Sequence, residues 1–459
     1  MAGTPYLIVF SHLRWGFIHQ RPQHLISRLA AHYKVLFIEE PVFAEPPARI
    51  DCLEVAKNVE VITPRTPIDA EGFHDDQLRV VKPMLTAYLR ERGIDDYLVW
   101  FYTPMALPTM SALAPRAVIY DCMDDVASSR SAPRQMRQRE AELLKAADLV
   151  LTSGPALYEA KRTLHSNVQC LPSAVDASHY APANLRAGSD EQRDALRLQG
   201  PIAQPRLGFF GVIDERIDLT LLAALADADE RWQIVMVGPV LRIDPATLPR
   251  RPNIHWLGMQ AYSRLPQLVA GWDVALMPFA LNESTRFMSP TKTLEYMAAE
   301  KPVVSTNIPD VVSLYGDVVR VSSSRSGFIE HCRESLGENG RLRAQRVMEM
   351  TQCVARFSWD QAARTVKDLI DAALQARSWA RPLEADANDA VRGVARQSSK
   401  SAALLSDIQS DFRVGPRPNP EWHRQPAQLL AAHAARVAGM RAADRAADGP
   451  PANESRHAA

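Results

Sequence analysis

Short apolar segments alternate with helical patterns through most of this 459-residue chain, in two separate runs. Each apolar segment is continuous instead of alternating with polar residues, which is typical of strands buried on both faces of a parallel sheet. The alternation of strands with helices predicts α/β units in which helices cover both faces of the sheet. We therefore expect two doubly wound, Rossmann-like α/β domains.

The first run extends to about Tyr180. It predicts strands at Tyr6–Phe10, Val35–Glu39, Val59–Thr63, Tyr97–Tyr102, Ala117–Tyr120, Leu149–Thr152 and Val168–Leu171. It predicts helices at Pro22–His32, Gln77–Arg92 and Arg134–Ala147. Ligands of such sheets bind at the carboxyl ends of the strands. The segments expected to line one crevice are therefore residues 11–21, 102–104, 121–125 and 153–154.

The second run begins after a polar stretch with a weak helical pattern at Glu191–Leu198. It predicts strands at Leu207–Gly211, Trp232–Val237, Ile254–Leu257, Val274–Met277, Val303–Ser305 and Val318–Val321. It predicts helices at Leu219–Asp227, Leu265–Ala270, Lys292–Ala299 and Ser326–Leu336. A longer helix is expected from Trp359 to about Gln375, capped by Ser358. Its apolar face consists of Ala362, Val366, Leu369, Ile370 and Ala373.

These patterns divide the chain into a first domain at residues 1–182, a linker at 183–205, and a second domain at 206–357. The terminal helix occupies residues 358–377. Residues 378–459 are rich in Ala, Arg and Pro and poor in large apolar side chains, which predicts a disordered tail. Within it, only Gln428–Ala443 favours a transient helix.

Composition excludes several classes of protein. A formal net charge of zero argues against a nucleic-acid binder. The five cysteines are irregularly spaced and suggest reduced thiols, and no spacing suits a metal site, so we expect neither metal nor cofactor. The first strand begins at Tyr6 without a signal peptide before it, and no segment is long enough to span a membrane. We expect a cytoplasmic protein, with peripheral contact to the inner face of the membrane left open.

The segment from Phe287 to Thr306 holds the strongest candidate site. Ser289 is suited to cap a helix, Pro290 to its first position, and Lys292 would follow within the first turn. Free N–H groups, the positive end of the helix dipole and a lysine together predict an anion site. Glu295 could then accept hydrogen bonds from vicinal sugar hydroxyls. A nucleotide-sugar diphosphate needs both groups, a cationic site for its diphosphate and a carboxylate that accepts hydrogen bonds from its sugar hydroxyls.

Other strand-end segments add candidates with competing interpretations. The loop after the first strand carries Arg14, Trp15, His19 and Arg21, which would form a lip of the cleft or pack on the sheet. Asp121 could bind sugar hydroxyls or act as a base, or it could bond its own turn. In the second run, Gly211 and Gly238 end strands and would allow close approach to a ligand, while Arg216 could neutralise phosphate.

An ordered series of these segments resembles the nucleotide-binding domain of bacterial GT-B-fold glycosyltransferases of family 4, the glycosyl transferases group 1 class. The series consists of residues 208–211, 234–238, 253–258, 273–278 and 289–305. The first half resembles a subgroup linked to cell-surface polysaccharide synthesis. That likeness rests on Ser11, Trp15, Arg21–Leu25 and Tyr120–Asp124.

The resemblance implies a two-domain enzyme that moves a sugar from a UDP- or GDP-type donor to a glycan or lipid-linked acceptor, usually with retention and without an obligatory metal. Glu295 would hold the donor ribose, and the terminal helix would cross back to the first domain. The implied donor site comprises Gly211, Gly238, Ser289, Pro290, Thr291, Lys292 and Glu295, with Lys292, Arg216 and Asp121 as catalytic candidates.

Three positions depart from the family pattern. The partner of Glu295, a glutamate eight positions earlier, is replaced by Phe287. The family's Arg and Lys after the first strand of the second domain correspond to Val212 and Ile217, which leaves Arg216 or Lys292 as substitutes. The glycine usual before the Lys-Pro-Val-Val sequence is Glu300, a residue with no ready positive-φ conformation. The missing glutamate favours one alternative, a nucleotide-sugar-binding or scaffold protein of the same fold without transfer activity. A GT-B-type epimerase or phosphorylase is a further alternative.

Overall fold

The computed structural model describes residues 4–125 and 134–395, with side chains described up to Arg377. Within these residues the chain forms two sheets in one compact unit. The predicted disorder beyond residue 395 and the transient helix at Gln428–Ala443 lie outside the described residues. Among the described helices, none has the length and apolar character needed to cross a membrane.

The first sheet consists of β1 (Tyr6–Ser11), β2 (Lys34–Glu39), β3 (Val42–Phe43), β4 (Arg49–Ala56), β5 (Val59–Thr66), β6 (Tyr97–Phe101), β7 (Val118–Cys122), β8 (Leu149–Thr152) and β9 (Val168–Cys170). Its order is β3-β5-β2-β1-β6-β7-β8-β9, and β4 pairs with β5. All pairs are parallel except β4 with β5. The direction of the strand order reverses between β1 and β6, which marks the switch point where ligands bind.

The second sheet consists of β10 (Arg206–Phe210), β11 (Gln233–Val237), β12 (Ile254–Trp256), β13 (Val274–Met277), β14 (Val303–Thr306) and β15 (Arg320–Ser322). All its pairs are parallel, in the order β12-β11-β10-β13-β14-β15. This is the strand order of the dinucleotide-binding fold, with its switch point between β10 and β13. The chain therefore contains two Rossmann-like halves.

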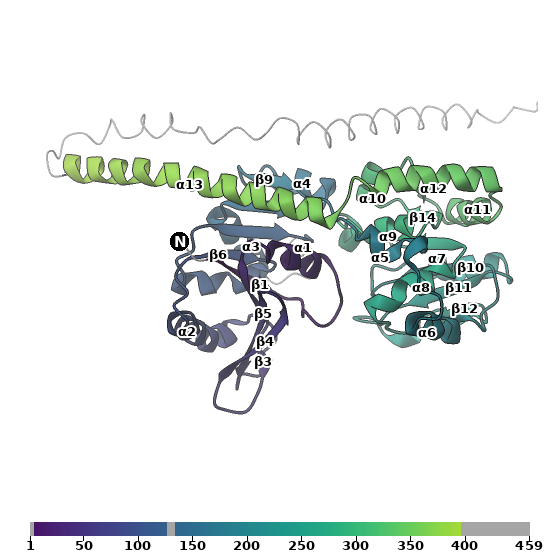
Figure 1. Cartoon of the computed structure of the whole chain (residues 1–459), viewed down its shortest axis with the longest axis horizontal. Helices are drawn as coiled ribbons and strands as arrows, with labels where there is room; N and C mark the ends of the chain where they lie inside the picture. The colour runs from purple at the N-terminus through teal and green to yellow at the C-terminus, as the bar shows by residue number, and fades with distance from the viewer. Residues whose placement is uncertain (1–3, 126–133, 396–459) are drawn as a thin grey trace, which may run out of the picture. The chain divides into compact units, whose positions relative to one another are not determined.

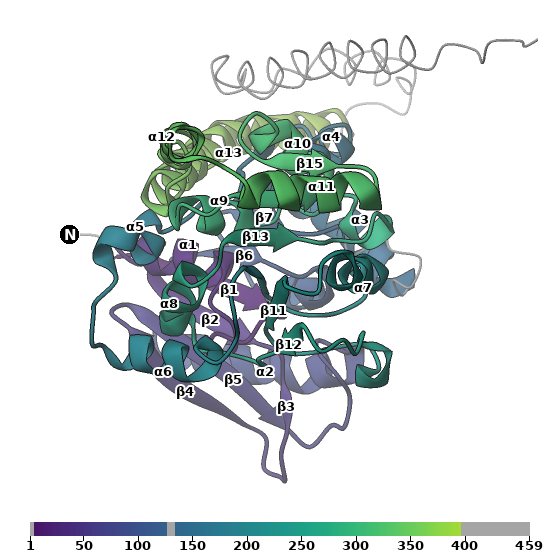
Figure 2. The same ribbon diagram turned by 90° about the vertical axis from the view of Figure 1, so that its right-hand side faces the viewer.

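Helices cover both sheets (Figure 1). The helices of the first half are α1 (Arg21–Leu29), α2 (Asp75–Glu91), η1 (Pro104–Ala112), α3 (Arg134–Ala146) and α4 (Pro155–Lys161). The connection contains α5 (Ala177–Tyr180), η3 (Pro182–Asn184) and α6 (Asp190–Gln199). The second half contains α7 (Leu219–Ala228), η4 (Pro245–Thr247), η5 (Tyr262–Arg264), α8 (Leu265–Ala270), η6 (Glu283–Thr285), α9 (Lys292–Ala298), α10 (Pro309–Tyr315), α11 (Arg325–Leu336) and α12 (Gly340–Val354). Figure 2 shows α7 and α11 beside the second sheet.

Successive residues of the central strands in the first sheet enter different cores. In β1, Leu7 and Val9 pack on the face that meets α1, while Ile8 and Phe10 pack on the opposite face. All four side chains are fully buried. Burial on both faces explains why such strands read as continuous apolar runs, and each predicted strand is present. Strands β3 and β4 were not predicted, because β4 is mostly exposed and carries charged residues.

The terminal helix α13 (Trp359–Ala395) packs on the first half, beside α1 (Figure 1). Its predicted apolar face is confirmed, with Val366 and Ile370 fully buried in the core of the first sheet. Ser358 caps it by accepting a hydrogen bond from the Gln361 N–H at 3.1 Å. The predicted end near Gln375 is wrong, since the helix continues to Ala395 through the start of the predicted tail.

Glu300 occupies the turn between α9 and β14 with a φ of 58°. The turn therefore keeps the left-handed backbone that suits a glycine, and Glu300 has to adopt it. An L-residue with a Cβ is strained in that region by about 1–2 kcal/mol. The side chain is exposed and gains no hydrogen bond among the described residues, so nothing local offsets this strain.

Replacing Glu300 with glycine should therefore raise the free energy of unfolding by about 0.5–1 kcal/mol, the relief of strain less the entropy that glycine loses on folding. Thermal unfolding of the purified protein measures the effect. Glu300→Ala is the matched control, because alanine removes the charge but keeps the Cβ. Equal stabilisation by alanine and glycine would show that the side-chain charge, and not the backbone, is responsible.

Asp310 joins the two halves of the chain. It lies in the first turn of α10 and its Oδ1 accepts a hydrogen bond from the backbone N–H of Ala156, in the first turn of α4, at 2.9 Å. Its Oδ2 is buried without a hydrogen-bond partner. Gly154 makes this approach possible, since a Cβ there would lie 1.7 Å from Oδ2. Burial raises the pKa of Asp310 to about 6, against smaller opposing effects of the Ala156 N–H and the neighbouring Ser289.

A carboxyl group that ionises less readily in the folded protein makes stability fall as pH rises from its ordinary pKa of 3.8 to about 6. Asp310→Asn should therefore melt at a higher temperature than the wild type at pH 8, by an amount equivalent to at most about 3 kcal/mol. At pH 4, where Asp310 is already largely protonated, the advantage should vanish. Thermal melts at both pH values test this, with exposed Asp95→Asn as the control. A pH-independent difference would contradict the assignment.

Candidate functional site

A cleft of about 710 Å³ lies between the strand ends of the two halves. Walls from the first half come from the loop after β1 and from the ends of β7 and β8, and walls from the second half come from the ends of β10 and β11 and from α9. Most of the predicted site residues line it. They are Trp15, His19, Arg21, Gly211, Arg216, Gly238, Ser289, Pro290, Thr291, Lys292 and Glu295.

Two glycines form the floor of the cleft where β10 and β11 end. Gly211 and Gly238 have φ values of 142° and 143°, which residues with side chains rarely adopt. A Cβ on Gly238 would lie 1.8 Å from the Gly211 carbonyl oxygen, and a Cβ on Gly211 would lie 2.2 Å from Cε of Lys292. Both positions therefore need glycine for conformation and for space. The two turns pack directly together and admit the lysine stem from α9.

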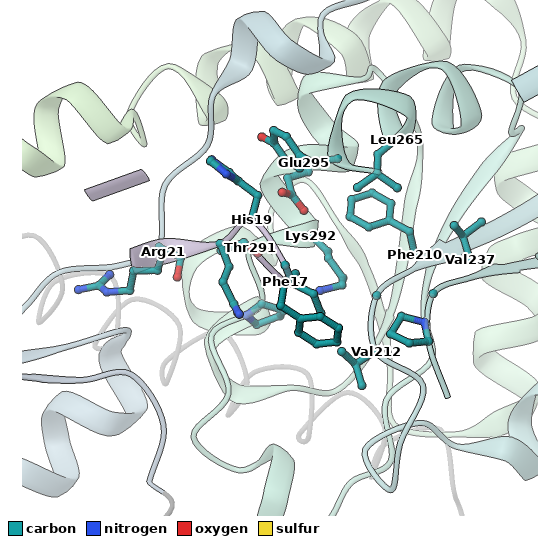
Figure 3. A pocket seen from close by; sticks show the side chains of 18 of the residues that line it. Phe17, His19, Arg21, Phe210, Val212, Val237, Leu265, Thr291, Lys292 and Glu295 are labelled. Carbon is teal, nitrogen blue, oxygen red and sulfur yellow. The ribbon is translucent and has the colours of Figure 1, made fainter. Parts of the chain in front are cut away.

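The ammonium group of Lys292 lies over this floor, 5.9 Å from the ring centre of Phe210 (Figure 3). It makes no hydrogen bond or ion pair with any residue in the described part of the chain. Desolvation lowers its pKa, with the nearby Glu295 carboxylate opposing that effect. A desolvated cation without a close counter-ion is stabilised when an anion enters the cleft.

The start of α9 differs from the prediction. The helix begins at Lys292, with Thr291 at the N-cap position and without a side-chain cap. Ser289 is therefore not the cap, and Pro290 is not the first helical residue. Pro290 instead belongs to a preceding turn, in which its carbonyl accepts a hydrogen bond from the Thr293 N–H at 3.4 Å. Because α9 has only seven residues, positive charge in this part of the cleft comes chiefly from the Lys292 side chain and not from a helix dipole.

Glu295 lies one turn after Lys292 and also faces the cleft (Figure 3). Its Oε1 accepts a hydrogen bond from the Tyr180 hydroxyl at 3.3 Å. Burial raises the pKa of Glu295, while the Lys292 charge and the Tyr180 hydroxyl act in the opposite direction. Tyr180 is 1% exposed and its ring stacks on Phe210. The tyrosine thus fixes one carboxylate oxygen and leaves the other available.

Arg216 enters the cleft after β10, held by a neighbouring carboxylate. Its Nε and Nη2 atoms donate to Asp214 at 2.7–3.1 Å, and Asp214 is almost completely buried. The Nη1 amino group has no hydrogen bond within the residues that the structure describes. This side chain is therefore fixed in position, with one donor group available to a ligand.

Asp121, predicted as a catalytic carboxylate, has a structural position instead. It is completely buried, does not line the cleft, and accepts three hydrogen bonds from Arg21 at 3.0–3.2 Å. Arg21 also donates to the Leu171 carbonyl at 3.0 Å, and its side chain points away from Lys292 and Glu295 (Figure 3). The guanidinium of Arg21 is therefore engaged by Asp121, although other atoms of Arg21 line the cleft. The buried position of Asp121 does not support its predicted catalytic role.

The rest of the loop after β1 is divided between packing and the cleft. Arg14 does not line the cleft, because its guanidinium binds Glu39 at 3.0 Å and the Glu40 carbonyl at 2.6 Å. Trp15 lines the cleft and also packs against Phe37, with 5.0 Å between ring centres.

His19 lies at the lip of the cleft, 4.7 Å from the Tyr262 ring of the second half. Burial, and then the nearby His179 and Arg28, lowers its pKa. The lip is therefore built from stacked rings contributed by both halves of the chain.

Two residues of the site were not predicted from the sequence. Tyr180 donates a hydrogen bond to Glu295 and the Tyr262 ring lies beside His19, although neither tyrosine follows a predicted strand. Of the segment 121–125, which was expected to line the crevice, Asp124 lines the cleft and Asp121 does not. Residues 4–125 and 134–395 contain no group of three or more His, Cys, Asp or Glu side chains placed to hold a metal ion.

The positions that depart from the family pattern also have defined places. Phe287 does not line the cleft and instead packs against the core of the first sheet, with the Arg286 guanidinium 5.0 Å from its ring centre. Val212 lines the cleft, whereas Ile217 is buried in the second core. Lys292 and Arg216 are thus the cations present on the second-half wall.

The second half matches a known family. Residues 204–337 match the model of the glycosyl transferases group 1 family. This region is therefore similar to the group 1 glycosyltransferases. The chain is also 26% identical over 273 residues to TuaH of Bacillus subtilis (strain 168), whose name assigns it provisionally to teichuronic acid biosynthesis as a glycosyltransferase. That alignment covers 56% of this chain and 67% of TuaH.

Solved structures share the GT-B fold across both halves. Sucrose-phosphate synthase from Thermosynechococcus elongatus superposes with a TM-score of 0.59 at 15% identity, covering 80% of this chain and 98% of that one. HepE of Anabaena, in complex with UDP-glucose, gives a TM-score of 0.59 at 15% identity, covering 80% and 99%. The UDP-forming trehalose-phosphate synthase of Burkholderia vietnamiensis gives 0.58 at 15% identity, covering 80% and 100%.

Removing the hydroxyl of Tyr180 should raise the pKa of Glu295, because that hydroxyl stabilises the ionised carboxylate. The carboxyl chemical shift of Glu295, followed by NMR through a pH titration of protein labelled at glutamate, would show the shift in Tyr180→Phe. Tyr33→Phe is the control, since Tyr33 is buried beside the first sheet. An unchanged Glu295 titration in Tyr180→Phe would show that the 3.3 Å contact contributes nothing to the carboxylate.

Proposed function

We propose that the protein is a glycosyltransferase that transfers a sugar from a UDP-sugar donor to a glycan or lipid-linked acceptor in cell-surface polysaccharide synthesis. One observation carries the proposal. The Lys292 ammonium lies desolvated over the glycine floor, and Glu295 faces the same cleft one turn later. A diphosphate and a ribose diol, joined as in a nucleotide, match this spacing of cation and carboxylate.

In this proposal the diphosphate lies between Lys292 and Arg216, and the glycine turns of β10 and β11 let it approach the backbone. Glu295, oriented by Tyr180, accepts hydrogen bonds from the ribose hydroxyls. When the bond between the sugar and the diphosphate breaks, negative charge grows on the leaving group. Two fixed cations in a desolvated site stabilise that charge, so transfer proceeds without a metal ion and, as in the family, with retention.

The comparisons favour UDP over GDP as the nucleotide. HepE has been solved with UDP and glucose and with UDP-glucose, and its fold covers 80% of this chain. The name of TuaH refers to the biosynthesis of teichuronic acid. We therefore place the reaction at the cytoplasmic face of the membrane, where a lipid-linked acceptor would be presented, with peripheral contact between protein and membrane.

The alternative is a protein of the same fold that binds a nucleotide sugar without transferring it. Phe287 supports this alternative, because the glutamate that often contacts the transferred sugar is absent and its replacement packs on the first sheet. The two proposals share the nucleotide site and differ in turnover. A GT-B-type epimerase would need an acid and base pair facing the sugar, and Asp121 does not supply one.

UDP should raise the melting temperature of the wild-type protein, by an amount equivalent to about 2.7 kcal/mol when UDP is at 100 times its Kd. Lys292→Met keeps the length of the side chain but removes its charge, and it should weaken UDP about 10–100-fold, as expected for a charge-assisted contact. Glu295→Gln should weaken UDP to a smaller extent, because the amide still accepts one hydrogen bond.

Lys57→Met is the matched control, since Lys57 is an exposed lysine on the turn between β4 and β5. Its UDP affinity should equal that of the wild type. GDP and UDP-glucose complete the panel and distinguish the base and the contribution of the sugar. If both Lys292→Met and Glu295→Gln bind UDP as tightly as the wild type, the assignment of this site is wrong.

A further inference from the structure

Five aromatic rings from both halves of the chain form a continuous series at the lip of the cleft. This ring column starts with Trp359 and continues through His24, His19, Tyr262 and His179. Successive ring centres are 5.0, 4.3, 4.7 and 4.2 Å apart. His19 and His24 come from the first half and Tyr262 from the second. The column therefore crosses between the halves at the contact of His19 with Tyr262.

The two ends of the column are anchored in different halves. Trp359 is buried in the core of the first sheet, and its ring stacks on His24 at an interplanar angle of 8°. His179 lies on α5, which packs against α8 and α9 of the second half. Its Nε2 donates to the Tyr262 carbonyl at 3.2 Å, and its ring lies flat on the Tyr262 ring. A movement of one half relative to the other thus separates the column in its middle.

The two connections between the halves lie beside the Trp359 end of the column. The chain passes to the second half before α5 and returns before α13. Val175 on the first connection donates its N–H to the Phe357 carbonyl on the second at 3.0 Å, and it also pairs with Ser358. Trp359 follows directly. Joined connections of this kind form a hinge, and the column lies between this hinge and the lip of the cleft.

Positive groups outnumber negative ones around the column. Arg28 of α1 donates to the His24 carbonyl at 3.0 Å and is paired with Asp360 of α13 at 2.5 Å. Asp176, which precedes α5, attracts positive charge on all three histidines. If the three imidazoles were protonated, they and Arg28 would place four positive charges against these two carboxylates. The column therefore favours neutral imidazoles.

The other charged groups on the elements beside the column have partners of their own. Glu295 of α9 accepts a hydrogen bond from the Tyr180 hydroxyl at 3.3 Å. Arg264 of η5 is paired with Asp194 of α6 at 2.5 Å. These contacts hold both groups in place, so they leave the charge balance of the column to Arg28, Asp176 and the histidines.

The pKa of each histidine is lowered in this arrangement. Burial, followed by the charges of His179 and Arg28, lowers the pKa of His19 against the effect of Asp176. Burial, followed by the charges of His19 and Arg28, lowers the pKa of His24 to about 3. Burial lowers the pKa of His179, whereas its hydrogen bond to a backbone carbonyl and the charge of Asp176 oppose this. The column is therefore most stable above the ordinary histidine pKa of 6.5 and weakens as pH falls below it.

We propose that the ring column is a latch between the two halves, closed while its histidines are neutral and released when they are protonated. Protonated His19 and His179 would carry like charges on two sides of the Tyr262 ring, and the halves would repel each other there. Release widens the cleft beside Glu295, because the Tyr262 ring lies 6.2 Å from that of Tyr180, the partner of Glu295. The latch does not depend on which reaction the cleft performs.

The test measures the separation of the halves in the full-length protein without a ligand. Spin labels are placed on Cys52, an exposed residue of β4, and on Leu196→Cys, at an exposed position of α6. Figure 1 shows β4 and α6 on the side of the molecule away from α13, so an opening about the hinge moves them apart. All samples carry Asp310→Asn, which silences the other titrating contact between the halves. Double electron–electron resonance then gives the distance distribution at pH 8 and at pH 5.5.

We expect a population with a longer distance to grow as the pH is lowered. A histidine that is neutral in the latch and has a pKa of 6.5 when released changes the ratio of closed to open protein by at most about tenfold at pH 5.5. The double variant His19→Phe, His24→Phe keeps two rings in the column but removes the protons from the first half. Its distance distribution should be nearly independent of pH. His32→Phe is the matched control, since His32 is exposed on the first half, and it should open like the reference protein.

Three outcomes would contradict the latch. The first is a distance distribution of the reference protein that is the same at both pH values. The second is an opening of the same size in the double phenylalanine variant, which would assign the pH dependence to other groups. The third is an opening accompanied by loss of the helical signal in far-UV circular dichroism, which would identify acid unfolding and not a hinge motion.

Discussion

The close packing of Gly211, Gly238 and Lys292 is the constraint on which the rest of the cleft depends. Two strands of the second sheet end side by side, and their turns touch through backbone atoms alone. A side chain on either glycine would collide with the other turn or with the lysine stem. The ammonium reaches the switch point of the sheet because these two positions carry no side chain. The position of this cation in the cleft therefore depends on the absence of side chains at two positions as much as on the lysine itself.

The charged residues of the first half divide into two groups according to their burial. Arg21 with Asp121, and Lys161 with Asp125, are closed pairs whose desolvation is offset by mutual hydrogen bonds. These pairs fix the ends of β7 and β8, where the chain turns back from the cleft. Within residues 4–125 and 134–395, the Asp124 carboxylate has no such partner, whereas Asp121 and Asp125 each have one. The two buried pairs hold the segment on either side of Asp124 in a fixed position.

The strands could be predicted from the sequence because burial on both faces leaves an unmistakable apolar run, as in β1 and β13. The start of α9 could not, since Pro290 suits a helical first position and an isolated turn equally well. The role of Asp121 was also beyond the sequence, because its partner Arg21 lies 100 residues earlier. Three aspartates in five residues looked alike, and only the tertiary contacts of each one determine which faces the cleft.

Phe287 and Asp310 show how the second half is tied to the first. Phe287 stands where the family pattern has a glutamate, and it packs on the core of the first sheet. Asp310 reaches the first turn of α4 through the space left by Gly154. Phe287 thus adds an apolar contact between the halves, and Asp310 adds a hydrogen bond between them. Both contacts lie outside the residues that line the cleft, so the two halves are joined without occupying it.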